Sequence, residues 1–122
     1  MKKLADKSIE IDNTIIYLTL FKLHKSYLLL ISDQKDMGIG SVTLASPPLV
    51  EGLKSTAASY NLFGVDQKLL STIISEKTSN ILKAPVLLLL FLKIKKNEEG
   101  IAKQLMKFLN EILKDIAEKQ NN

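Results

Sequence analysis

The chain has 122 residues, of which 46% are hydrophobic and 25% charged, and these are ordinary values for one globular domain with its own core. All 17 basic residues are lysines, against 13 acidic residues, and cysteine is absent. The lack of cysteine excludes disulfides and thiolate sites, and the lack of arginine removes the side chain that most often makes forked contacts with phosphate or guanine.

We predict one domain over residues 1–122, with residues 1–7 and 118–122 frayed because both ends are polar. The basic start is followed by no apolar segment of the signal-peptide type. The longest apolar run, residues 84–92, is shorter than the about 20 residues that a membrane-spanning helix needs. We therefore expect a cytoplasmic protein. Because the lysines are spread along the chain, neither nucleic acid nor membrane is expected as a partner.

The first predicted elements are two strands joined by a tight turn. Ile9 and Ile11 alternate with acidic residues, which indicates a strand with one solvated face. Asp12 and Asn13 tolerate positive φ and suit the turn. The second strand, residues 14–21, is apolar on both faces, with Ile16, Leu18 and Leu20 on one and Ile15, Tyr17 and Phe21 on the other.

Two further strands are predicted after a polar turn at residues 23–26. Residues 27–32 are again apolar on both sides, whereas residues 40–46 place Val42 and Leu44 on one face. The polar segment between these two strands is expected to be a loop.

The chain changes character after Pro47 and Pro48. Residues 49–64 show no periodicity and are predicted to be a loop that could include a helical turn. From Val65 the apolar spacing becomes helical, and Asp66 would lie in the first turn, where its charge suits the helix dipole. The apolar positions of this helix are Leu69, Leu70, Ile73, Ile74, Ile81 and Leu82.

Residues 84–94 are predicted to be a buried strand, since this run is short, apolar and bounded by a proline. Asn97 would cap a second helix that begins with two glutamates. The apolar stripe of that helix is Ile101, Leu105, Phe108, Ile112 and Ile116. The predicted fold class is therefore α+β: a mostly antiparallel sheet in the order ββββ-α-β-α, with both helices on one face.

The second face of this sheet is the main indication of function. At about 4.8 Å per strand, the five predicted strands form a sheet about 24 Å wide, and helices about 10 Å across cover one face of it. Three of the strands are apolar on both faces, so the other face would expose apolar surface on the order of several hundred Å², which soluble monomers seldom do. We expect that face to be packed in a dimer, most simply a two-fold one, or within a sandwich.

The residues around Ile39 raise the question of a phosphate-binding loop, because Gly38 and Gly40 flank it. Thr43 stands where a third glycine would be needed, and a strand follows rather than a helix, so a tight or bulged strand entry is the better interpretation. Met37 and Ile39 would then lie at an edge of the sheet. They are candidate partner-binding residues, with core filling as the alternative.

Lys93, Lys95 and Lys96 are the other candidate partner-binding residues, at the end of the last predicted strand. They either keep that strand end soluble or contact an acidic surface of a partner.

No catalytic, cofactor-binding or metal site is predicted. His24 is the only histidine and is expected on the surface, in a hairpin turn. Asp33 and Asp36 lie in a loop and, without further ligands, are expected to be solvated. We therefore expect a protein that is not an enzyme and needs no cofactor.

The order of elements resembles that of the small proteasome assembly chaperones of the third and fourth types. The matching stretches are KDMGIGSVTL at 35–44, YNLFGVDQKLLSTIIS at 60–75 and APVLLLLFLKI at 84–94, followed by the last helix. In layout they cover most of the chain. Two features depart from the simplest form of the Met-Gly turn: Asp36 separates Lys35 from Met37, and Gly40 is extra.

The resemblance implies a non-enzymatic α+β protein that dimerises through its sheets, as a homodimer or related heterodimer, and binds proteasome α-subunits during ring assembly. Larger members carry a C-terminal hydrophobic-Tyr-x motif, whereas this sequence ends in EKQNN, so docking by such a tail is not expected. Two alternatives stay open. One is a small enzyme or ligand-binding domain with a pocket between the helices and residues 49–64, and the other is a nucleic-acid scaffold.

Overall fold

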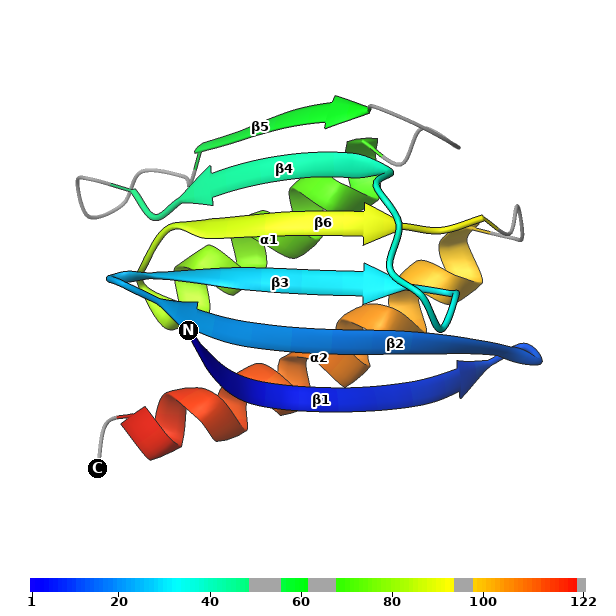
Figure 1. Cartoon of the computed structure of the whole chain (residues 1–122), viewed down its shortest axis with the longest axis horizontal. Coiled ribbons are helices and arrows are strands. Elements are labelled where there is room, and N and C mark those ends of the chain that lie inside the picture. Colours follow the sequence, from blue (N-terminus) through cyan, green and yellow to red (C-terminus); the bar gives the residue numbers. More distant parts are fainter. Residues whose placement is uncertain (49–55, 62–67, 94–97, 121–122) are drawn as a thin grey trace.

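The computed structural model describes residues 1–48, 56–61, 68–93 and 98–120. These residues form one sheet with two helices behind it, which confirms the α+β class (Figure 1). The element bounds are β1 (Lys2–Ile11), β2 (Thr14–Leu23), β3 (Ser26–Ser32), β4 (Ser41–Ser46), β5 (Thr56–Asn61), α1 (Lys68–Leu82), β6 (Val86–Phe91) and α2 (Glu98–Gln120).

The sheet has six strands in the order β1-β2-β3-β6-β4-β5. Strands β3 and β6 are parallel, and every other neighbouring pair is antiparallel, so the prediction of a mostly antiparallel sheet is confirmed. The predicted turn between β1 and β2 is also confirmed. Asp12 and Asn13 both have positive φ, at 50° and 64°, as a two-residue hairpin turn of this type requires.

Strand β5 was not predicted, and the chain order is therefore βββββ-α-β-α rather than ββββ-α-β-α. Its sequence, TAASYN, contains few branched or aromatic side chains and no apolar alternation, so it carries little strand signal. The strand exists because β4 offers it a partner, with Ser41 opposite Asn61 and Ser46 opposite Thr56. The rest of the predicted 49–64 loop lies outside the described residues.

The described residues at each end that was predicted to fray mostly belong to regular elements. β1 begins at Lys2, so residues 2–7 belong to the sheet, and α2 continues through residues 118–120. The reason at the start of the chain is the length of β2, which runs on to Leu23 and pairs with β1 as far as Lys22 opposite Lys2. Polar composition predicted fraying, but backbone pairing decides the outcome.

The core lies between the sheet and the two helices, which cover the same face, as predicted (Figure 1). The strands contribute the alternate side chains that point toward the helices, and α2 contributes a stripe of leucines. The fully buried members include Ile16, Leu18, Leu20, Leu29, Ile31, Leu88, Leu105, Leu109 and Leu113. The predicted stripe of α2 is rotated slightly, since Phe108 and Ile112 are only partly buried and pack at the margin of this core.

Helix α1 packs on the sheet with four of its six predicted apolar residues, Leu70, Ile74, Ile81 and Leu82, and also with hydroxyl side chains that the apolar pattern did not predict. Its buried residues are Ser71, Ile74, Ser75, Thr78, Ser79 and Leu82. Leu69 and Ile73 are instead 76% and 44% exposed. Small side chains let the helix lie close to β4 and β5. Their hydroxyl groups are hydrogen-bonded, for example Ser75 Oγ to the carbonyl of Ser71 at 2.7 Å. Asp66 and Asn97, the predicted helix-start residues, lie outside the described residues.

Candidate functional site

The face of the sheet turned away from the helices is the candidate site, and it is called the open face below. It carries the alternate side chains of each strand, those that do not enter the core. In Figure 1 the sheet lies in front of both helices, so this face is turned to the viewer. Its apolar members are Ile15, Tyr17, Phe21, Leu28, Leu30, Val42, Leu44, Tyr60, Leu87, Leu89 and Phe91.

The strand register places these side chains in continuous rows across the sheet. One row runs from Thr19 through Leu30, Leu89 and Val42 to Tyr60, and the next runs from Phe21 through Leu28, Leu87 and Leu44 to Ala58. The central leucines are half-buried by their neighbours, whereas Leu44 is 52% and Tyr60 67% exposed. The open face is therefore a contiguous apolar surface across five of the strands.

Strand β4 contributes to this surface in an unusual way. Its apolar residues Val42 and Leu44 lie together on one face, as predicted, and that face is the open one. The side chains it turns toward α1 include Ser41 and Thr43, which are 2% and 0% exposed. Ser41 Oγ lies 2.9 Å from Ser71 Oγ of α1, in a buried hydroxyl pair.

The edge strand β1 closes one side of the open face with polar groups. Lys3 lies opposite Phe21, Asp6 opposite Thr19 and Glu10 opposite Ile15. Lys3 Nζ and Asp6 Oδ2 form an ion pair at 3.4 Å. Apolar rows bounded by a polar margin have the layout of a protein interface, which has an apolar centre and a polar rim.

The glycines around Ile39 are explained by close packing and not by phosphate binding. The chain between β3 and β4 must cross the end of β6, which lies between them in the sheet, and it does so in front of β6 (Figure 1). A Cβ atom on Gly38 would lie 2.7 Å from the ring of Phe91, and one on Gly40 would lie 2.4 Å from the carbonyl oxygen of Leu90. At Gly40 only a residue without a side chain fits, because the clash is with backbone, whereas at Gly38 a side chain would require the ring of Phe91 to shift.

Two of the predicted partner-binding residues lie beside this crossing. Ile39 is 55% exposed, and the exposed Lys93 follows β6, with its Nζ atom 5.9 Å from the centroid of the Phe91 ring. Asp33 holds the two segments together, because its carboxylate oxygens accept the backbone N–H of Lys93 at 3.0 Å. Asp33 is therefore buried and hydrogen-bonded, not solvated as expected.

The other three predicted partner-binding residues are Met37, Lys95 and Lys96. Met37 is half-buried in the same crossing segment. Lys95 and Lys96 lie outside the described residues. Sequence reasoning missed the open-face side chains as individual site residues, although its argument about strands apolar on both faces contained the necessary signal.

Catalytic, metal-binding and membrane-spanning features are sparse among the described residues. His24 is exposed in the turn between β2 and β3, as predicted. Among residues 1–48, 56–61, 68–93 and 98–120, no group of three or more His, Cys, Asp or Glu side chains is placed to hold a metal ion. Neither described helix is long and apolar enough to cross a membrane. The alternative pocket beside residues 49–64 falls largely outside the described residues.

Comparison with known proteins finds similarity at the level of fold. No family model matches the sequence, and no curated protein matches it. Among solved structures, the chain is similar to one from the crystal structure of a novel chaperone complex for yeast 20S proteasome assembly. The identity is 10%, the match covers 94% of each chain, and the TM-score is 0.55. At this identity the likeness establishes a common fold and nothing about activity.

Proposed function

We propose that the chain is a non-enzymatic protein-binding module, that its open face packs against the same face of a second copy, and that the dimer is an assembly chaperone for proteasome α-subunits. The observation that carries the proposal is the contiguous apolar open face. Exposed side chains such as Leu44 and Ile15 cost free energy in a lone molecule, and burying them against another apolar sheet recovers it.

The size of the open face fits a dimer interface. Six strands at about 4.8 Å spacing and about 20 Å long give a flat sheet area of roughly 580 Å². The uneven surface of the side chains makes the accessible area larger. A standard interface buries about 800 Å² on each partner. This estimate covers the whole face, including the charged strand β1, so the margins of the face would have to supply the remaining area of a standard interface.

A second copy is favoured as the occupant because the face is self-complementary. The two central rows carry no charged side chain between β2 and β5, so two copies can approach without bringing like charges together. The charges lie on β1, where Lys3 and Asp6 form an ion pair and Glu10 lies opposite Ile15. An isologous two-fold contact would keep that pair at the solvated rim.

The α-subunit would bind outside this interface, at the rim that holds Ile39 and Lys93. Lys93 is exposed there, and the whole chain has a net charge of +4, which would steer the dimer to an acidic surface. The choice of a proteasome subunit is supported by the likeness in fold to a chain from a yeast proteasome assembly complex and by the resemblance of the sequence layout.

Two measurements test the proposal. In sedimentation velocity at micromolar concentration we expect twice the 13.6 kDa mass of one chain. In a pull-down with individually purified proteasome α-subunits, we expect capture of at least one, reduced by Lys93→Glu and unaffected by Lys103→Glu on the exposed surface of α2. A clean monomer would refute the dimer. A dimer that captures no α-subunit would refute the chaperone assignment alone.

A further inference from the structure

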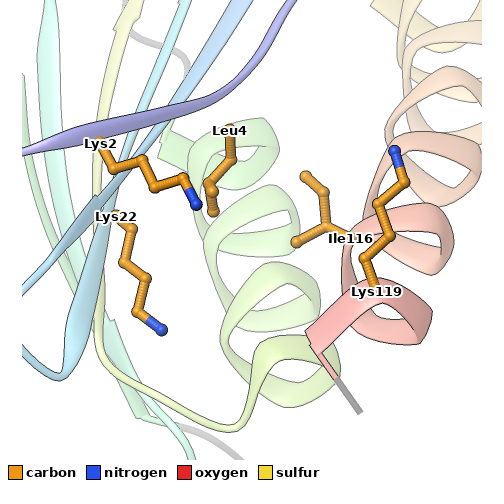
Figure 2. A pocket seen from close by; sticks show the side chains of 5 residues that line it. All are labelled: Lys2, Leu4, Lys22, Ile116 and Lys119. Atoms are coloured by element: carbon orange, nitrogen blue, oxygen red, sulfur yellow. The ribbon is translucent and has the colours of Figure 1, made fainter. Parts of the chain in front are cut away.

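A concavity lies on the helix side of the sheet, where β1 begins and both β2 and α2 end (Figure 2). Its volume is about 260 Å³, and it is lined by Lys2, Leu4, Lys22, Ile116 and Lys119. The sheet separates it from the open face, so it is distinct from the proposed dimer interface.

A β-bulge shapes the apolar part of this concavity. The register between β1 and β2 shifts between Lys3 and Ala5, which makes Leu4 an extra residue in the strand. A bulge of this kind redirects a side chain that would otherwise follow the alternation of the strand. Leu4 consequently lines the concavity together with Ile116 of α2 (Figure 2).

The remaining lining residues are all cations. Lys2 lies directly opposite Lys22 in the strand register, and like charges directly opposite each other destabilise a sheet. Lys119 comes from the last turn of α2. Among the described residues, no ion pair is found for these three ammonium groups, and the exposed acids of α2 nearby, Asp115 and Glu118, do not line the concavity. The site thus concentrates positive charge beside an apolar surface.

We propose that this concavity binds a small amphiphilic anion, that is, a carboxylate or phosphate joined to a short apolar body. Lys2 and Lys22, which lie opposite each other, would neutralise the head group, Lys119 would add to the positive potential, and Leu4 and Ile116 would contact the body. At about 30 Å³ for each water-sized group, a volume of about 260 Å³ holds roughly nine non-hydrogen atoms. Heptanoate and pentyl phosphate have about this size and serve as probes for the two head groups.

The test is a titration of the ¹⁵N-labelled full chain followed by amide chemical shifts. We expect saturable shifts confined to the start of β1, the end of β2 and the end of α2 with at least one probe. Heptan-1-ol, which lacks the charge, and acetate, which lacks the body, should bind at least tenfold more weakly. Binding should also weaken as salt is added, because the ammonium groups are partly exposed.

Two matched double variants distinguish specific binding in the concavity from non-specific attraction of the anion to a positively charged protein. Lys2→Gln with Lys22→Gln should weaken probe binding at least tenfold. It should leave the free protein at least as stable in urea, because a repulsive pair is removed. Lys103→Gln with Lys107→Gln removes the same charge from the exposed surface of α2 and should change the affinity less than twofold.

The proposal is overturned if neither probe gives saturable shifts at these three elements. It is also overturned if both double variants weaken binding equally, since the attraction would then be diffuse. Leu44→Lys on the open face should leave probe affinity unchanged, so failure of the dimer does not affect this test.

Discussion

Replacing Leu44 with lysine should dissociate the proposed dimer without unfolding the chain. Leu44 lies in a central row of the open face, between Leu87 of β6 and Ala58 of β5. Its side chain is 52% exposed in the single molecule, so a lysine there can extend into solvent as long as no second sheet covers it. The substitution therefore acts on association and not on the core.

The size of the effect follows from the area that remains to be buried. Complete burial of a leucine side chain contributes about 1.5–3 kcal/mol, and about half of this is still available at Leu44, which is 52% exposed. A two-fold dimer contains the residue twice, so the lost apolar burial is about 1.5–3 kcal/mol for the dimer, or about a ten- to hundredfold change in Kd at 1.4 kcal/mol per factor of ten. Two ammonium groups would also be desolvated, which adds to the loss.

Sedimentation equilibrium over a range of concentrations measures this change, and Leu69→Lys is the matched control. Leu69 is 76% exposed on α1, on the other side of the sheet. We expect Leu44→Lys to raise the dissociation constant at least tenfold and Leu69→Lys to leave it within twofold. Unchanged association for Leu44→Lys, with a folded circular dichroism spectrum, would refute the use of the open face.

Three further predictions concern stability and are measured by urea unfolding. Gly40→Ala should cost about 1–3 kcal/mol and more than Gly38→Ala, because the new methyl group meets a backbone carbonyl in the first case and a movable aromatic ring in the second; the reverse order would contradict the proposed crossing. Ser41→Ala and Ser71→Ala should each cost about 1 kcal/mol, and the double variant should cost less than their sum, since no unpaired hydroxyl remains; strict additivity would mean that the two hydroxyls do not interact. Asp33→Ala should cost about 1–3 kcal/mol by leaving a backbone N–H without its acceptor, and a loss below about 0.5 kcal/mol would show that water replaces the carboxylate there.

The strongly patterned elements were predictable from the sequence. β2, β3 and β6 carry enough apolar residues for period and length to identify them, and the order of residues in β2 correctly divided its side chains between two faces. β5 was not predictable, because its pairing with β4 and not its composition makes it a strand. The extension of β1 to Lys2 has the same origin.

The candidate site was predictable as a surface but not as a set of residues. Three strands that are apolar on both faces indicated that one apolar face of the sheet would remain uncovered by the helices. The strand register then shows which side chains meet on that face. The concavity at the end of α2 depends on a bulge at Leu4 and on the register of Lys2 with Lys22. Neither is visible in the sequence, because a shift of one residue reverses the face on which every side chain lies.

Strand β4 favours the proposal that the open face is covered by a second copy. A strand at the surface of a monomer normally turns its apolar side chains to the core and its polar ones to water. β4 departs from this pattern, since Ser41 and Thr43 are buried beside Ala45 on the helix side, whereas Leu44 is in solvent. The buried hydroxyl groups have hydrogen-bond partners within the protein, since Ser41 Oγ lies 2.9 Å from Ser71 Oγ and Thr43 Oγ1 lies 2.7 Å from Ser59 Oγ. Burying them on the helix side therefore costs little free energy. Covering the open face would make the arrangement more favourable, because the leucine would then also leave water, and this supports the proposed dimer.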